Sequence, residues 1–208
     1  AIVLVGNKVY VLDNVYAYTR LIDEVEDLTW FATPYVAIGS YTGDERDKEY
    51  TADTTHVYAR YTGYYLVTKN LDGLQADGSL YTLPGPTSSN ASKGWGLTGI
   101  FDGNGYTISN IKVQSRGIFG AVTAGVVKNI AFKDITVSGH YQCIVAHSVT
   151  NVDIDPAVSG KEIGTLENIY VEGTTITYEN SNGSAGILTQ GNCYAYMLNI
   201  VMTHNLSK

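Results

Sequence analysis

A four-residue form that occurs four times constrains the fold of this 208-residue chain more than any other feature: asparagine, isoleucine, any residue, then an apolar residue. The copies begin at Asn110, Asn129, Asn168 and Asn199. The intervals between them are unequal, and the apolar residues around them alternate with the period of two that is typical of β-strands. This pattern excludes a regular helical repeat. Short strands stacked turn upon turn tolerate the variation, because extra residues loop outward.

The similarity between the copies extends beyond these four residues. GVVKNI (125–130) matches GTLENI (164–169), while GIFGAV (117–122) and GILTQG (186–191) begin their units at similar distances upstream. These units predict a mostly β protein in which residues 61–208 form a short right-handed parallel β-helix. Asparagine tolerates left-handed backbone geometry, so we expect the repeated asparagines at corners, with their side-chain amides in a ladder and the following isoleucine in the core.

Residues 1–60 lack this repeat and are expected to cap one end of the β-helix. Apolar residues on both sides of the Gly6-Asn7 dipeptide predict a tight β-hairpin. Apolar residues then recur at helical spacing from Leu21 through Val25 to Leu28, which predicts one helix that ends as Pro34 approaches. The cap is therefore expected to consist of a hairpin, a helix and a loop.

The stretch DGNG (102–105) has the composition of a ligand loop, but its context favours a structural corner. A dinucleotide-binding fingerprint would need a third glycine where Ile108 stands and a helix after it, whereas a strand pattern follows. An EF-hand calcium loop spreads its ligands over about twelve residues and ends in a glutamate. Gly103 and Gly105 are therefore predicted to provide backbone freedom for a turn. No cofactor and no metal centre is expected, and a weakly held calcium ion at the surface is the one ion left open.

The units from residue 101 onward resemble a known repeat. FDGNGYTISNI (101–111) and GIFGAVTAGVVKNIAFKDITVSG (117–139) are very similar to the glycine-rich GLUG-type repeat of bacterial surface proteins and adhesins, and GYYLVTKNLDGL (63–74) resembles the strand that usually precedes it. The resemblance implies a β-helical stalk or adhesive domain on a bacterial cell or a phage-borne surface protein. Ala146 and Thr189 replace the second glycine of GIFG in two later units, which bears on the number of turns more than on the fold.

Charge and composition limit the class of partner. With 20 acidic and 13 basic residues, a net charge of -7 and no basic stripe, the chain is not expected to bind nucleic acid. No apolar run approaches the ~20 residues that cross a bilayer, so no membrane insertion is expected. Only 16% of the residues are charged, against roughly a quarter in ordinary soluble domains, and glycine and tyrosine are abundant. This profile predicts an extracellular protein or one displayed on a cell or particle surface.

The ends and the cysteines add two expectations. The chain begins at Ala1 without a methionine, which predicts a segment excised from a longer protein. Cys143 and Cys193 are the only cysteines. A disulfide and two free thiols both remain open at this point, because sequence does not show whether the two Cα atoms approach within about 7 Å.

Aromatic residues in the middle of the chain are the predicted ligand-binding surface. Tyr61, Tyr64, Tyr65 and Trp95 lie in or near the loop-rich middle of the chain, where residues 83–96, rich in Pro, Gly, Ser and Asn, are expected to be a mobile loop. Exposed aromatic rings stack on sugars, and phenol hydroxyls orient them. The expected function is a non-enzymatic, adhesin-like binding or structural module that contacts a glycan or a partner surface protein, with a homo-oligomer or larger assembly compatible with it.

Two other functions remain open. A β-helical polysaccharide lyase or glycoside hydrolase would need acidic residues facing one groove, and Asp134, Asp153 and Asp155 are the candidates for that role. A purely architectural part of a fibre, spike or phage particle would need neither a groove nor a ligand. The second of these predicts a stable oligomer or filament in solution.

Overall fold

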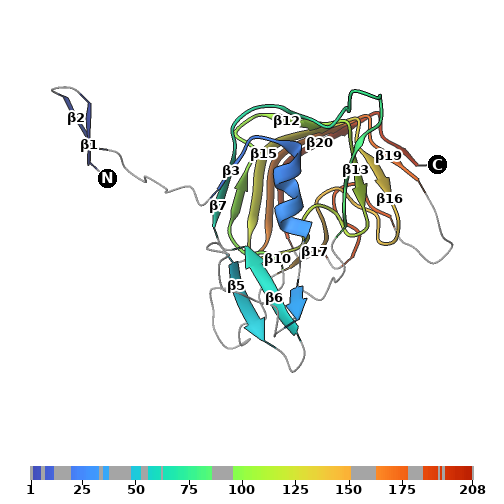
Figure 1. Ribbon diagram of the computed structural model, residues 1–208, viewed down its shortest axis with the longest axis horizontal. Helices are drawn as coiled ribbons and strands as arrows, with labels where there is room; N and C mark the ends of the chain where they lie inside the picture. Colours follow the sequence, from blue (N-terminus) through green and yellow to red (C-terminus); the bar gives the residue numbers. More distant parts are fainter. Residues whose placement is uncertain are drawn as a thin grey trace.

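The computed structural model describes residues 2–5, 8–11, 20–32, 35–37, 48–52, 56–61, 63–85, 96–150, 163–177, 185–191, 193 and 195–207. Within these ranges the protein is mostly β, with parallel sheets and one helix (Figure 1). The predicted mostly β class is confirmed.

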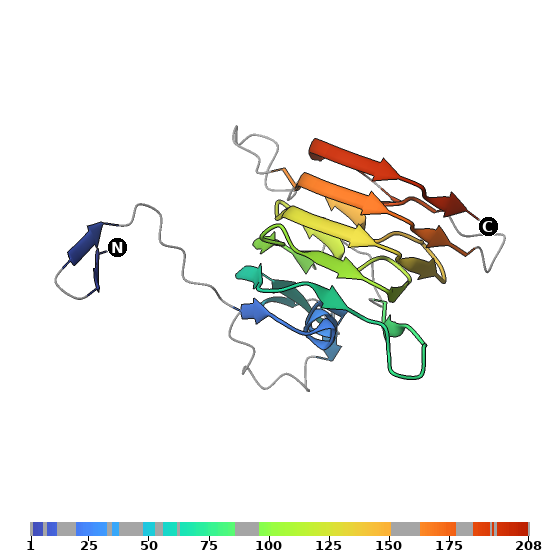
Figure 2. The same cartoon turned by 90° about the horizontal axis from the view of Figure 1, so that it is seen from above.

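The largest sheet has eight strands, and its main strands lie in the order in which they occur in the chain. Six of them pair in parallel with their neighbours: β3 (Arg20–Ile22), β7 (Tyr64–Val67), β11 (Ile100–Asp102), β15 (Val126–Lys133), β18 (Thr165–Glu172) and β20 (Tyr196–Thr203). The short strands β8 (Leu71–Asp72) and β12 (Thr107–Ser109) pair with each other, and β12 also pairs with the second half of β15. Figure 2 shows the resulting stack, from β3 in blue to β20 in red.

Two further sheets lie beside the eight-stranded one, and a stretch of chain that runs from one sheet to the next is called a pass here once it returns to the sheet where it began. One has five parallel strands: β9 (Tyr81–Leu83), β13 (Ile111–Gln114), β16 (Thr136–Ser138), β19 (Thr175–Ile176) and β21 (Leu206–Ser207). The other has six: the parallel strands β6 (His56–Tyr61), β10 (Gly96–Leu97), β14 (Gly120–Thr123) and β17 (Ala146–Thr150), with β4 (Tyr35–Ala37) and β5 (Lys48–Ala52) antiparallel to β6. From β10 to β19 the chain visits the six-, eight- and five-stranded sheets in turn, and each strand pairs with its counterpart from the preceding pass. The last described pass adds β20 and β21 and meets β17 only through isolated bridges.

The core consists of columns of apolar residues that this register stacks one above another. In the eight-stranded sheet Phe101 pairs with Val127 and Val127 with Leu166, and all three side chains are fully buried. Equivalent columns run through Ile108, Phe132 and Val171 and, in the five-stranded sheet, through Val113, Val137 and Ile176. Apolar residues at every second position therefore meet in the interior, since successive side chains of a strand point to opposite faces.

One end of the stack is covered by the 3₁₀ helix η1 (Val25–Ala32). Its Phe31 side chain is fully buried and packs edge-to-face against Tyr61, Tyr65, Phe101 and Phe119, with ring centroids 4.9–5.8 Å apart. The predicted helix is present, but it begins at Val25 and not at Leu21. Leu21 belongs to β3, where it pairs with Leu66, and its side chain is 52% exposed. The apolar stripe of the helix therefore begins at Val25.

The predicted N-terminal hairpin is confirmed as a local structure. β1 (Ile2–Val5) and β2 (Lys8–Val11) pair antiparallel, with Ile2 opposite Val11 and Val5 opposite Lys8. They form a sheet of their own and join none of the three larger sheets (Figure 1). Within the described residues the cover over the first strands is formed by η1 and not by the hairpin.

The segment that was predicted to be a mobile loop was expected to begin at residue 83, but Leu83 ends β9 and is fully buried. Residues 86–95 lie outside the described residues.

In the part of the chain that the structure describes, no helix has the length and apolar character needed to cross a membrane.

Candidate functional site

Three of the four repeated asparagines form the predicted amide ladder. Asn129, Asn168 and Asn199 all have positive φ, at 54°, 51° and 56°. The side-chain Nδ2 of Asn199 donates to Oδ1 of Asn168, and Nδ2 of Asn168 donates to Oδ1 of Asn129, each at 2.9 Å. Asparagine suits this position because it tolerates left-handed geometry and its amide both donates and accepts.

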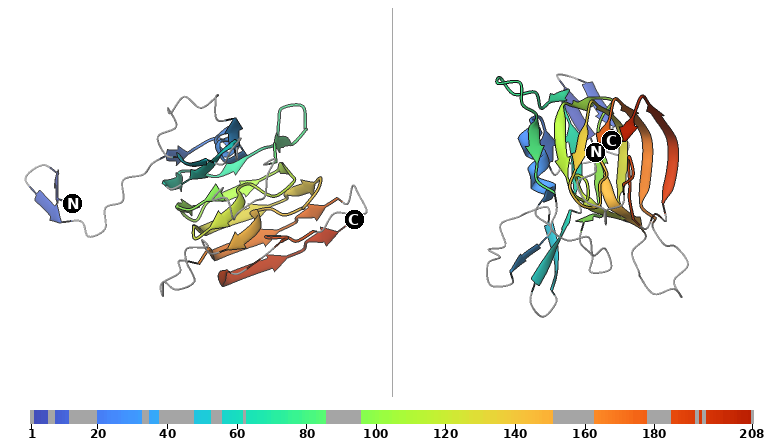
Figure 3. Two further views of the ribbon diagram at one scale, coloured as in Figure 1. Left: turned by 90° about the horizontal axis from the view of Figure 1, so that it is seen from below. Right: turned by 90° about the vertical axis from the view of Figure 1, so that its right-hand side faces the viewer.

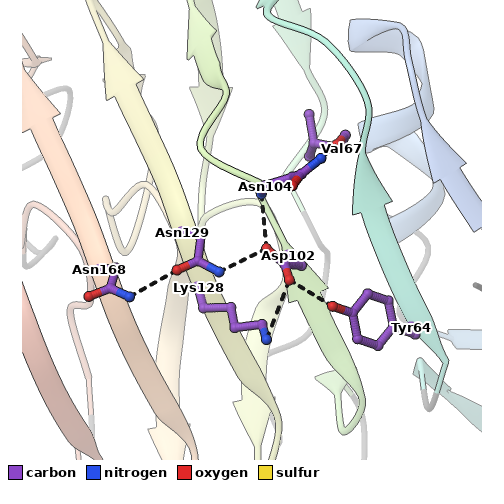
Figure 4. Close-up of polar contacts among 7 residues, drawn as sticks. All are labelled: Tyr64, Val67, Asp102, Asn104, Lys128, Asn129 and Asn168. Atoms are coloured by element: carbon purple, nitrogen blue, oxygen red, sulfur yellow. Dashed lines mark hydrogen bonds and ion pairs between the residues drawn. The ribbon is translucent and has the colours of Figure 1, made fainter. Parts of the chain in front are cut away.

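The ladder ends on Asp102, which is 7% exposed (Figure 4). Its Oδ1 accepts hydrogen bonds from Asn129 Nδ2 at 3.1 Å and from the backbone N–H of Asn104 at 2.9 Å. Its Oδ2 accepts from the Tyr64 hydroxyl at 2.7 Å and lies 3.4 Å from Lys128 Nζ. Burial by itself would raise the pKa of the Asp102 carboxyl, but the three hydrogen bonds and the lysine outweigh it and lower the pKa below its ordinary value.

These contacts indicate that Asp102 is a structural group and not an acid–base catalyst. A general acid in a hydrolase needs a carboxyl whose pKa is raised towards neutral pH, whereas that of Asp102 is lowered. Both oxygens already accept hydrogen bonds, and Asn104 Nδ2 is directed to the carbonyl oxygen of Val67 at 3.5 Å. A calcium ion at the 102–105 turn would have to displace these donors.

The turn itself has the corner geometry expected from its glycines, although for two different reasons. Gly105 has a φ of 80° and open space around it, so it is used for its backbone conformation. Gly103 is used for its lack of a side chain, because a Cβ there would lie 2.5 Å from the carbonyl oxygen of Asn129. The next pass of the chain therefore approaches Gly103 more closely than any other residue type would permit.

Asn110 was predicted to belong to the same ladder, and this prediction is wrong. It lies between β12 and β13, at the corner that leads into the five-stranded sheet, and its Nδ2 donates to Oδ1 of Asp72 at 2.9 Å. The equivalent positions in later passes are Asp134, Gly173 and His204, which also have positive φ. The pattern of asparagine followed by isoleucine thus occurs at a corner between two strands in the case of Asn110 and at a left-handed bend inside a strand in the case of Asn129, Asn168 and Asn199, because both positions need a left-handed residue followed by a buried one.

The described members of the predicted aromatic binding surface do not form such a surface. Tyr61 and Tyr65 are fully buried and pack against Phe31, so their rings are not accessible to a sugar. Tyr64 points to the other side of β7 and is half-buried, with its hydroxyl engaged by Asp102. Trp95 lies outside the described residues. The prediction failed for the two buried tyrosines because alternation along a strand does not show which of its faces is covered.

The acidic candidates are only partly described. Asp134 is exposed, with a φ of 52°, and its backbone N–H donates to the carbonyl oxygen of Glu172. Lys133 Nζ lies 3.8 Å from Glu172 Oε2, on the outer face of the large sheet. Asp153 and Asp155 lie outside the described residues. Asp134 therefore takes part in a corner, as Asn110 does in the pass before it.

A cluster that the sequence did not indicate lies where the chain leaves the five-stranded sheet. Arg116 and Tyr141 have positive φ, at 66° and 57°, and the guanidinium carbon of Arg116 lies 5.1 Å from the Tyr141 ring centroid. The rings of His140 and His147 lie 4.1 and 4.7 Å from that of Tyr141. Burial lowers the pKa of His147, helped by the charges of Arg116 and His140 and opposed by a hydrogen bond with Gln190.

Spacing along the chain does not mark this cluster as a site, because His140, Tyr141 and His147 are spaced like ordinary loop residues of one pass and Arg116 joins them only through the stacking of the pass before. Bulky residues at positive φ are uncommon and cluster at functional sites, which makes this corner the candidate for chemistry. A neutral imidazole beside a tyrosine and an arginine has the groups to accept a proton near an anion.

An open pocket of about 290 Å³ lies between the start of η1 and the segment that contains β8. Its charged lining residues are Asp23, Glu24, Glu26, Lys69 and Asp72. The described residues include no group of three or more histidine, cysteine, aspartate or glutamate side chains that could hold a metal ion. The excess of carboxylates gives this pocket a negative character.

Cys143 and Cys193 are both free thiols, which decides the question that the sequence left open. Cys143 is fully buried, and burial raises the pKa of its thiol. Cys193 is exposed. Because a nucleophilic cysteine needs a lowered pKa, Cys143 acts as a small apolar core residue.

The comparisons with known proteins add no family. No protein-family model matches the chain, and neither the curated proteins nor the solved structures include a match to it.

Proposed function

We propose that the chain is a short right-handed parallel β-helix that serves as a non-enzymatic, adhesin-like binding or structural module on an extracellular, cellular or particle surface. The observation that carries this proposal is the repeated passage through three parallel sheets, in which each pass places an asparagine on the asparagine of the one before. Such a stack presents a long outer surface on a rigid scaffold, as solenoid binding proteins do. The similarity of residues 101–139 to the GLUG-type repeat supports the same reading.

The chemistry of the described residues favours binding over hydrolysis. The most buried carboxylate, Asp102, is fully engaged in hydrogen bonds and has a lowered pKa. Asp134 is at a corner, and the carboxylate of Glu172, the residue that accepts its backbone hydrogen bond, lies 3.8 Å from Lys133 Nζ. Exposed loops and the outer faces of the three sheets are therefore the surfaces on which a glycan or a partner protein would be held.

A glycan array with the 208-residue protein, followed by a depolymerisation assay on each glycan that binds, tests this proposal. We expect saturable binding to a glycan or to a surface protein without turnover, in the presence and in the absence of calcium. Turnover that is lost in Asp134→Ala but retained in Glu167→Ala, a half-buried position in β18 of the eight-stranded sheet, would refute the non-enzymatic role.

One observation favours a second function. The Arg116, Tyr141 and His147 cluster combines a cation with an imidazole whose pKa is lowered, and a lyase that removes a proton beside a sugar carboxylate needs a base and an anion-binding group. A lyase would generate an unsaturated sugar that absorbs in the ultraviolet when the protein is mixed with polyuronates. Absorbance that rises with the wild type and not with His147→Gln would favour this function over the first.

A further inference from the structure

The last strand of the large sheet presents an apolar edge. Five large apolar side chains of β20 are 44–58% exposed: Tyr196, Met197, Leu198, Val201 and Met202. The strand has eight residues and no charged side chain. It pairs with β18 on one side and with no described strand on the other. Figure 3 shows β20, in red, at the opposite end of the stack from η1.

The exposure of β20 follows from the register of the core. Met197, Ile200 and Met202 pair with Leu166, Ile169 and Val171 of β18, which are all almost completely buried. They therefore continue the core columns, but no later pass among the described residues covers them. Leu198 and Val201 continue the outer face, opposite Glu167 and Tyr170. An edge strand of this length without charge or proline is the kind that pairs with another strand.

We propose that this edge pairs with the same edge of a second copy of the chain, so that two stacks join end to end. The β20 strands run antiparallel about a two-fold axis that passes between Asn199 and Ile200. In this register Met197 faces Met202 of the second copy, Leu198 faces Val201, and Tyr196 faces Thr203. On both sides of the central Asn199–Ile200 pair, where the positive φ of Asn199 interrupts the alternation, inward side chains thus meet inward ones and outward meet outward, because directly opposed residues of an antiparallel pair lie on the same face.

Three features of the structure favour a second copy over other occupants. The opposite end is covered by η1, so copies cannot continue head to tail, whereas two identical edges form a closed two-fold pair. The edge brings no like charges together, since β20 carries none. The five exposed apolar side chains offer roughly 500 Å² per copy, so two copies bury at most roughly 1,000 Å², about the lower limit of a specific interface. This inference rests on the strand pairing and is independent of the proposed surface role.

The mass of the full chain in solution, measured over a range of concentrations, tests the proposal. We expect a concentration-dependent dimer for the wild type. Val201→Lys places a charge opposite Leu198 in both halves of the dimer and is expected to raise the dissociation constant about tenfold or more. Leu74→Lys is the matched control, because Leu74 is 55% exposed and lies in the loop between β8 and β9. Circular dichroism of both variants checks that they remain folded.

A crosslinking experiment tests the register. In a Cys193→Ser background, Leu198→Cys and Val201→Cys are expected to form a disulfide only when the two variants are mixed, since each cysteine faces the other position across the axis. A mixture of Leu198→Cys and Thr203→Cys is the control and should remain uncrosslinked. A wild type that stays monomeric, a dimer unaffected by Val201→Lys, or crosslinks in the control mixture would each overturn the proposal. If the protein is monomeric, β20 would be available to pair with a further strand of a longer chain or with a strand of another protein.

Discussion

The substitution of Asn168 tests the amide ladder directly, because this residue is its middle member. Its side chain donates one hydrogen bond to Asn129 and accepts one from Asn199, and its φ is 51°. Glycine at this position removes both hydrogen bonds but keeps the backbone conformation accessible. Alanine removes the same hydrogen bonds and also has to adopt the left-handed conformation.

The magnitudes of these two effects can be separated. A hydrogen bond contributes about 0.5–1.5 kcal/mol, and both bonds of Asn168 are exposed, so the lower end applies and Asn168→Gly should lose about 1 kcal/mol. The left-handed conformation adds about 1 kcal/mol or more for alanine, so Asn168→Ala should lose about 2 kcal/mol. For a protein of this size each kcal/mol lowers the melting temperature by about 2–4 °C.

Chemical denaturation followed by far-ultraviolet circular dichroism measures both losses. Glu167→Ala is the matched control, because Glu167 is the adjacent, half-buried residue of the same strand and its φ is not positive. We expect its free energy of unfolding to stay within about 0.5 kcal/mol of the wild type. Equal losses for glycine and alanine would refute the role of the backbone conformation. A glycine variant as stable as Glu167→Ala would refute the contribution of the ladder.

Three further predictions concern the corner, the covered end and the buried carboxylate. Gly103→Ala should destabilise more than Gly105→Ala in the same denaturation assay, because a Cβ at Gly103 meets backbone at 2.5 Å whereas Gly105 has open space and pays only for its φ of 80°; the reverse order would contradict the close approach. Phe31→Ala should cost about 3–5 kcal/mol, since the ring is fully buried among four aromatic rings, and a loss below about 1 kcal/mol would show that η1 is not packed on the core. The lowered pKa of Asp102 stabilises the fold above its ordinary value of 3.8, and this contribution disappears as the pH falls through the folded value. The free energy of unfolding should therefore fall less between about pH 5 and pH 3 in Asp102→Asn than in the wild type, and an identical pH dependence would contradict the lowered pKa.

Several parts of this structure could be predicted from local residues. The pairing of β1 with β2 was predicted from a short dipeptide between two apolar runs, and the ladder positions Asn129, Asn168 and Asn199 depend on a residue type that accepts left-handed geometry. The alternation of apolar residues predicted strands, and the unequal intervals between repeats predicted short strands with loops of variable length between them. All of these features require information from only a few neighbouring residues.

The register and the covered faces required the tertiary structure. Asn110 and Asn129 share the asparagine–isoleucine pattern, and only the pairing of β12 with the second half of β15 shows that Asn110 lies at a corner whereas Asn129 lies inside a strand. Tyr61 and Tyr65 look like surface aromatics until η1 packs Phe31 against them. The Arg116 and Tyr141 contact joins two consecutive passes, whose separation in the chain depends on the loops between them.

The sequence by itself thus determined the class of fold, the strands and the residues that turn its corners, because these depend on short-range backbone preferences and on alternation. The tertiary structure alone decided where each asparagine lies in the fold and which aromatic rings are buried. It also decided how four neighbours hold Asp102 and that the apolar edge of β20 has no described partner on one side. Each of those outcomes depends on which pass of the chain lies beside which, and that is set by contacts between residues tens of positions apart, which no local pattern encodes.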